Sequence, residues 1–162
     1  MSTSDSPLFT ATDDDAPRRG LPFVERNAVT AIVRDPHVHR YLILRWNTVD
    51  WHTFVTGGIE DGQTPEQAAR AEVRQETGYK NLRLVANLPP YQAKFYHTPK
   101  RVNRHAHFRS FLFELENSLR DPIAPEEAAL HEGIWLNDIA IQACPLNEGH
   151  RFLYEHIISN SL

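Results

Sequence analysis

Short apolar runs separated by polar and turn-forming residues dominate the chain and predict a structure rich in β-strands. Runs of β-branched, aromatic and aliphatic residues predict strands at Ala28–Val33, Tyr41–Trp46, Trp51–Thr56, Leu82–Leu88, Ala93–His97, Ala106–Glu116 and Gly133–Leu136. The segment RDPHVHR between the first two runs predicts a closely connected strand pair. Pro89 and Pro90 are expected to end the strand that begins at Leu82.

A helix with marked ends is predicted between the third and fourth strands. Thr64 is a natural N-cap, Pro65 fits the first helical position, and Gln67 completes a capping box with Thr64. Gly78 predicts the stop. A brief helix is expected from Asn137 to Ala143, and helical spacing of apolar residues predicts an amphipathic helix at Asn147–Ser159. The fold class is therefore α+β, a mixed sheet with one helix between strands and one at the end.

The central helix carries Glu72 and Glu76 on one face, one turn apart, together with Ala68. A solvated acidic stripe is one interpretation. The other is a metal and diphosphate site, because the turn at Gly57 and Gly58 brings backbone N–H and carbonyl groups directly to the helix start. We favour the second interpretation, since a separate face of the helix already has a conventional charged pattern.

Composition limits the class of protein. The 162 residues are 41% hydrophobic and carry a formal charge of −4, which suits one globular domain and argues against a protein that coats nucleic acid. The single cysteine, Cys144, excludes a disulfide framework and is expected to be a small buried apolar residue. Neither a membrane span nor a signal peptide is visible, so a cytoplasmic protein is expected.

The first 22 residues differ in composition from the rest, being rich in Ser, Thr, Asp and Pro with an acidic run at Asp13–Asp15. They are expected to form a disordered tail, followed by one domain over residues 23–162.

Residues Lys94–Arg109 form a basic stretch without acidic residues in which aromatic side chains are interleaved. Such a patch suits the phosphates of a nucleotide or of an RNA end, with Arg101 and Arg104 as contacts. The alternative is a solvated hairpin whose aromatic residues belong to the core. His105 and His107 share one face of a strand, but the sequence offers no third ligand at a convincing spacing, so no metal is expected there.

Residues 57–79 resemble the signature of the Nudix hydrolases, G-x5-E-x7-R-E-hydrophobic-x-E-E-x-G-hydrophobic. The match places Gly57 at the leading glycine, Glu72 and Glu76 at two helix glutamates, and Gly78 at the last glycine. A looser similarity links other segments, among them NAVTAIV, to Nudix domains appended to some bacterial leucyl-tRNA synthetases. The family implies an α/β/α sandwich and Mg²⁺- or Mn²⁺-dependent hydrolysis of a nucleoside diphosphate linked to a second group.

Three positions depart from the signature. Gln63 replaces the glutamate of the turn, Ala71 replaces the arginine before Glu72, and Gln75 replaces the middle glutamate of the helix. A glutamine offers a neutral carbonyl oxygen to a cation and cannot act as a general base. The missing charge is therefore expected to weaken the site without removing it.

The resemblance then implies a set of roles. Glu72, Glu76 and the Gly57 carbonyl are expected to hold the metal, and Gln75 and Gln63 complete the catalytic positions. Gly57 and Gly58 of the turn are expected to contact substrate, with Arg101 and Arg104. Members of the family often place a further glutamate before the last strand, and the candidates for this general base are Glu126, Glu127 and Glu132.

Two functions remain open at this stage. The first is a pyrophosphohydrolase that acts on a nucleotide-derived small molecule. The second is a weak or inactive Nudix module that binds a nucleotide or an RNA end. The family often forms homodimers, although nothing in this sequence specifies an interface.

Overall fold

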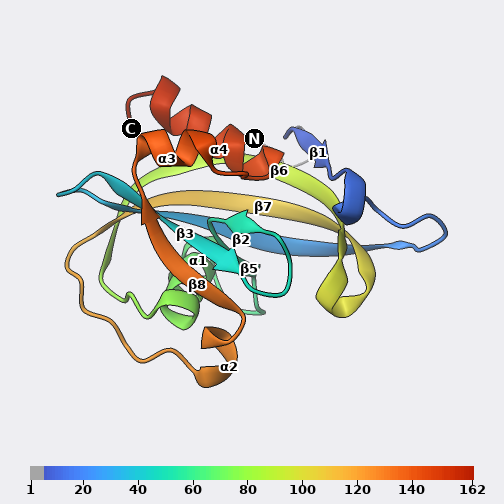
Figure 1. Cartoon of the computed structure of the whole chain (residues 1–162), viewed down its shortest axis with the longest axis horizontal. Coiled ribbons are helices and arrows are strands. Elements are labelled where there is room, and N and C mark those ends of the chain that lie inside the picture. The colour runs from blue at the N-terminus through green and yellow to red at the C-terminus, as the bar shows by residue number, and fades with distance from the viewer. Residues whose placement is uncertain (1–5) are drawn as a thin grey trace.

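Residues 6–162 form a mixed β-sheet with helices on both faces, as the computed structural model of the chain describes (Figure 1). The strands are β1 (Leu8–Thr10), β2 (Phe23–Asp35), β3 (Arg40–Trp46), β4 (His52–Thr53), β5 (Val55–Gly58), β6 (Leu82–His97), β7 (Val102–Leu115) and β8 (His131–Leu136). The α-helices are α1 (Pro65–Thr77), α2 (Pro125–Ala128), α3 (Asp138–Ala143) and α4 (Glu148–Ser159), with short 3₁₀ turns η2 (Asp13–Asp15) and η3 (Thr98–Lys100). The α+β class predicted from the sequence is confirmed.

The sheet is organised around the long parallel pair of β2 and β7. The strand order is β1-β6-β7-β2-β3-β4, while β5 pairs with β2 and β8 pairs with β3. β2 and β7 run in parallel from Phe23 opposite Asn103 to Arg34 opposite Glu114. The predicted connection of β2 to β3 is an antiparallel pair, with Arg34 opposite Tyr41. Distant segments of the sequence thus meet along β2 and β7.

β2 is buried on both faces, which explains its continuous apolar run. On one face, Val29 and Val33 belong to a core that includes Val73 of α1. On the other face, Ile32 packs in a second core with Leu153 of α4. Because successive side chains of a strand alternate in direction, this one strand anchors helices on both faces of the sheet (Figure 1).

Helix α1 begins and ends as its sequence predicts. Thr64 Oγ1 accepts a hydrogen bond from the Gln67 backbone N–H (3.1 Å), and Gln67 Oε1 accepts one from the Thr64 N–H (2.9 Å). At the other end, Gly78 has a left-handed backbone with φ of 82°. Glycine adopts this conformation without the steric cost of a side chain, so the helix stops there.

The prediction that Pro89 and Pro90 end their strand is wrong. β6 continues through both prolines to His97, and its register with β7 shifts between Leu88 and Tyr91. At such a bulge the extra residues are not part of the regular ladder, so the missing N–H groups of the prolines are tolerated.

The predicted disordered tail over residues 1–22 is wrong for part of its length. Leu8–Thr10 pairs in parallel with β6, with Leu8 opposite Gln92. Further along, Asn103 Nδ2 donates hydrogen bonds to the carbonyls of Arg18 (2.8 Å) and Leu21 (3.0 Å). An exposed edge of the sheet thus provides pairing partners for a segment of polar composition. Residues 1–5 of the predicted tail lie outside the described residues.

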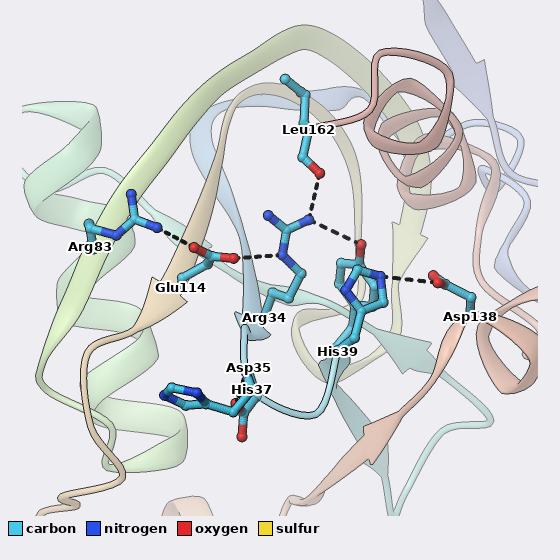
Figure 2. A network of polar contacts seen from close by, with 9 residues as sticks. Arg34, Asp35, His37, His39, Arg83, Glu114, Asp138 and Leu162 are labelled. Atoms are coloured by element: carbon cyan, nitrogen blue, oxygen red, sulfur yellow. Dashed lines mark hydrogen bonds and ion pairs between the residues drawn. The ribbon is translucent and has the colours of Figure 1, made fainter.

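A buried polar network closes the end of the β2–β7 pair where Arg34 faces Glu114 (Figure 2). Arg34 Nε lies 3.0 Å from Glu114 Oε2, and Arg34 Nη1 donates to the Leu162 carbonyl at 2.8 Å. Glu114 is also paired with Arg83. Both members of the Arg34–Glu114 pair are buried, so each charge depends on the other for compensation.

Candidate active site

Gly57 and Gly58, predicted to form a turn, are instead the last residues of β5 and pair with β2, and two charged side chains lie against the strand there. A Cβ atom at Gly57 would lie 2.1 Å from Cδ of Glu72, and one at Gly58 would lie 2.7 Å from Nη2 of Arg26. Both distances are shorter than real Cβ contacts allow. Glycine at these two positions therefore lets Glu72 and Arg26 approach the end of β5 closely.

Four side chains meet beside the end of β5 and form what we call the carboxylate cluster: Glu72, Glu76, Glu127 and His131. Glu72 and Glu76 come from α1, Glu127 from α2, and His131 is the first residue of β8. Ligand atoms of Glu76, Glu127 and His131 lie within 4.8 Å of one another. Glu76 is only 8% exposed, and its Oε2 is buried without a hydrogen-bond partner.

Burial and mutual repulsion disfavour the ionised forms of the two helix glutamates. Burial, followed by the charge of Glu127, raises the pKa of Glu72 to about 7, although Arg26 acts in the opposite direction. Burial raises the pKa of Glu76 well above its ordinary value, and the charges of Glu72 and Glu127 add to this effect. A bound cation would reverse this balance, because it compensates the repulsion between the carboxylates.

Gln75 contacts the same cluster by an unexpected route. Its Nε2 donates a hydrogen bond to Glu127 Oε1 at 2.8 Å, and Glu127 Oε2 lies 3.1 Å from His131 Nε2. A carboxylate at position 75 would repel Glu127, whereas the amide holds it. Gln75 therefore orients a third carboxylate toward the site.

The three candidates for the further glutamate are separated by their contacts. Glu127 lies in the carboxylate cluster. Glu132 pairs instead with Arg45, opposite it in the β3–β8 ladder. Glu126 is exposed on the surface of the α2 turn. The geometry therefore favours Glu127.

The remaining residue predicted for the catalytic set, Gln63, closes the turn between β5 and α1. Its Oε1 accepts a hydrogen bond from the Glu60 N–H at 2.9 Å, and its own N–H donates to the Glu60 carbonyl at 3.1 Å. These contacts make Gln63 a turn-forming residue. Its catalytic role, like those of Glu72, Glu76 and Gln75, stays a prediction.

Arg26, Lys100 and Arg104 form a second group, the cationic cluster, around His97. Arg104 is 7% exposed, and no carboxylate of residues 6–162 lies within ion-pair distance of it. Burial and the charge of Arg26 lower the pKa of Arg104 to about 10. Burial, together with Arg104, Arg26 and Lys100, lowers the pKa of His97 to about 4. A buried, uncompensated guanidinium is the arrangement that an anionic ligand would stabilise.

Aromatic rings connect the two clusters. The Trp46 ring lies 4.9 Å from the His131 ring and 6.4 Å from the Trp51 ring, measured between centroids. Trp51 in turn lies 6.4 Å from His97, and its Nε1 donates to Asp15 Oδ2 at 3.0 Å. The N-terminal segment thus holds the orientation of Trp51, a half-buried ring beside the cationic cluster.

Part of this arrangement is predictable from the sequence. Arg104 is in the cationic cluster as expected for an anion contact, whereas Arg101 lies exposed in the turn after η3 with φ of 54°. Arg26 was missed, because nothing in the pattern of β2 distinguishes it. His131 follows Glu127 by four residues, and this short spacing between an imidazole and a carboxylate was a usable signal, although His131 lies in β8 and not in α2.

Comparison with protein families gives one match that spans most of the chain. The family model for the NUDIX domain matches residues 24–156. No curated protein matches the sequence.

Solved structures of known proteins share the fold at low sequence identity. The Escherichia coli dihydroneopterin triphosphate pyrophosphohydrolase superposes with a TM-score of 0.64 and 20% identity, over 85% of this chain and 99% of that one. A structure from work on MutT of Aliivibrio salmonicida and Vibrio cholerae gives a TM-score of 0.58 and 14% identity, over 85% and 99% of the two chains. A UDP-X diphosphatase gives 0.61 and 13%, over 87% and 66%. At these identities the similarity concerns the fold alone.

Proposed function

The chain belongs to the Nudix family of pyrophosphohydrolases, and we propose that it hydrolyses a nucleoside diphosphate linked to another group in a reaction dependent on Mg²⁺ or Mn²⁺. The observation that carries this proposal is the carboxylate cluster. Glu76 is buried there beside Glu72 and Glu127, and its Oε2 has no hydrogen-bond partner. Burying ionised carboxylates together is costly unless a cation compensates them.

The donor set fits a hard divalent cation. Mg²⁺ and Mn²⁺ prefer carboxylate and carbonyl oxygens, and Glu72 and Glu76 would hold such an ion with the Gly57 carbonyl, which leaves Glu127 as the base. When bound, it would neutralise the charge of the diphosphate oxygens and favour attack at phosphorus. The lack of a carboxylate at position 75 lowers the charge of the set, so we expect moderate activity.

Different residues of the chain then have different roles in hydrolysis. Water attacks one phosphorus, the bond to the bridging oxygen breaks, and the water proton passes to Glu127, which Gln75 holds by its hydrogen bond. Arg26 and Arg104 bind phosphate oxygens of the substrate. Trp51, oriented by Asp15, supplies a face on which a base stacks.

The test is a substrate panel with a matched pair of variants. ADP-ribose, dinucleoside polyphosphates, NADH and nucleoside triphosphates are incubated with Mg²⁺ or Mn²⁺, and release of nucleoside monophosphate or phosphate is measured. We expect turnover of a nucleoside diphosphate derivative that Glu76→Gln lowers about a hundredfold or more, corresponding to roughly 3 kcal/mol. Glu126→Gln, on the exposed surface, is the control and should retain activity. No turnover with either metal, or full activity of Glu76→Gln, contradicts the proposal.

A module that only binds nucleotide is the second candidate, and the neutral amide of Gln75 is the observation that favours it. The double variant Ala71→Arg with Gln75→Glu restores the family signature at both helix positions. Strong turnover by this variant, where the natural chain has none but binds nucleotide, identifies the natural chain as a binder.

A further inference from the structure

A second group of metal-binding side chains lies at the opposite end of the β2–β7 pair from the Arg34–Glu114 network. Glu25 of β2 is directly opposite His105 of β7, and His107 lies two residues further along the same face. The sequence showed the two histidines but no third ligand. The parallel register supplies Glu25, which is 80 residues away from His105 along the chain.

The three side chains converge on a small volume. Glu25 Oε1 lies 3.0 Å from His105 Nδ1, and Glu25 Oε2 lies 2.9 Å from His107 Nε2. The two imidazole rings are 4.3 Å apart between centroids. Ligand atoms of all three residues lie within 4.8 Å of one another. One ion could therefore contact all three with small side-chain movements.

The hydrogen bonds of Gln92 determine which nitrogen of His105 faces Glu25 without a proton. Gln92 Nε2 donates to the Ser6 carbonyl at 3.1 Å, so the Gln92 carbonyl oxygen is the atom that faces His105 Nε2 at 2.8 Å. His105 Nε2 must then donate, which leaves a lone pair on Nδ1 of the neutral ring. Two acceptors, His105 Nδ1 and Glu25 Oε1, therefore face each other at 3.0 Å unless a proton or a cation lies between them.

We propose that Glu25, His105 and His107 bind Zn²⁺ or another late first-row divalent ion, at a site separate from the carboxylate cluster. Two imidazoles and one carboxylate form a donor set that favours such ions over Mg²⁺. The hydrogen bond from His105 Nε2 to Gln92 is the support that metal-binding histidines commonly have on their other nitrogen. The Glu25 side chain is 65% exposed, so the ion reaches the site directly from solvent and keeps open coordination positions.

The affinity should be moderate because only one histidine has such support. His107 Nδ1 is buried without a hydrogen-bond partner. Coordination through Nε2 places the ring proton on Nδ1, where nothing accepts it. We therefore expect dissociation constants in the micromolar range, weaker than those of structural zinc sites.

The proposed site is next to the cationic cluster along both strands but lies on the other face of the sheet. Arg26 of the cationic cluster directly follows Glu25 in the sequence, and Arg104 directly precedes His105. Adjacent residues of a strand point to opposite faces, so the proposed ion lies behind the strand pair whose other face carries the two arginines.

The experiment titrates Zn²⁺ and Co²⁺ into the full chain carrying Glu76→Gln, which weakens competing binding at the carboxylate cluster. Calorimetry reports affinity, and the visible absorption of bound Co²⁺ reports the donor set. We expect each of Glu25→Gln, His105→Asn and His107→Asn to weaken binding at least tenfold. His37→Asn, which changes an exposed histidine outside the site, is the matched control and should bind as before.

A second measurement on the unsubstituted chain makes the proposal independent of how the variants fold. Long-range ¹H–¹⁵N spectra of the imidazoles, recorded during Zn²⁺ titration, should show Nδ1 of His105 and Nε2 of His107 shifting together. Added Mg²⁺ should leave both unchanged. Saturating Zn²⁺ without a shift of these nitrogens, or equal weakening by His37→Asn, overturns the proposal.

Discussion

Single side chains determine the negative charge of the carboxylate cluster and the orientation of its carboxylates. Gln75 donates to Glu127 at 2.8 Å, and Glu127 in turn contacts His131. An amide at position 75 therefore removes one negative charge and orients another carboxylate. The buried Glu76 lacks this kind of partner, which makes it the residue most dependent on a cation.

The role of Glu127 as proton acceptor is tested by comparison with its neighbour. Glu127→Gln keeps the shape of the side chain but removes the base, so kcat should fall about 10²- to 10⁴-fold. Steady-state kinetics with the best substrate of the panel measures this loss. Glu126→Gln is the control, and similar losses in both variants would contradict an assigned role for Glu127.

The raised pKa of Glu72 predicts a pH-dependent stability of the metal-free chain. Because its pKa is about 7 in the folded state against an ordinary 4.5, the folded state favours the protonated form. The contribution of Glu72 to the free energy of unfolding is therefore fully present below about pH 4.5 and is lost as the pH rises through 7. Glu72→Gln should be more stable than the natural chain at pH 8 by about 2 kcal/mol, after allowance for screening at a partly exposed group, and equally stable near pH 4.5.

Thermal unfolding in a chelator, at both pH values, measures this difference. Comparison with Glu72→Gln cancels the opposite effect of His150, whose buried ring has a pKa lowered to about 3. Mg²⁺ should remove most of the advantage of the variant at pH 8. If the difference in melting temperature between Glu72→Gln and the natural chain is the same at both pH values, the raised pKa of Glu72 is refuted.

At the scale of elements, the turn from β5 into α1 builds the site. Gly57 and Gly58 at the end of β5 allow Glu72 and Arg26 to lie against this strand, while the capping box and Gly78 fix the length of the helix. The helix is then held against β2 by Val73 and its core neighbours. The position of the carboxylates therefore depends on close backbone approach at the start of the helix.

Gly57→Ala tests this dependence. The new Cβ would lie 2.1 Å from Glu72 Cδ, so the Glu72 side chain must move away. We expect activity to fall at least tenfold while circular dichroism remains that of a folded protein. Gly133→Ala is the matched control, because its Cβ would meet Leu42 at an ordinary 3.5 Å. Full activity of Gly57→Ala would mean that the contact with Glu72 is dispensable.

At the scale of the whole molecule, the β2–β7 pair links three polar groups. The Arg34–Glu114 network lies at one end, the proposed zinc ligands lie at the other, and Arg26 and Arg104 project beside the candidate active site. Helices α1 and α4 cover the two faces between them (Figure 1). No helix within residues 6–162 combines the length and apolar character that crossing a membrane requires.

Arg34→Met tests how much the buried pair contributes to stability. It leaves Glu114 without its buried partner, and the free energy of unfolding should fall by about 3 kcal/mol. Thermal and urea unfolding measure the loss. Arg83→Met removes the exposed partner of the same carboxylate and should cost about 1 kcal/mol or less. Equal losses in the two variants would contradict the importance of burial.

Local signals made much of the fold predictable. The capping residues Thr64 and Gln67, the stop at Gly78 and the apolar periodicity depend on neighbours in the chain, so α1 and most strands could be located in advance. The paired prolines at positions 89 and 90 gave a wrong prediction of the strand end. The bulge that accommodates them depends on both β6 and its partner β7, so it cannot be read from one segment.

The sequence by itself determined the α+β class, the family and the placement of Glu72 and Glu76 on one face of a helix. Each of these follows from patterns among residues close together in the chain. Tertiary structure alone distinguished Glu127 from Glu126 and Glu132, joined Arg26 to Arg104, and placed Glu25 against His105. These contacts depend on strand register and on the path of loops. Register is fixed by burial of whole faces, which no short segment encodes.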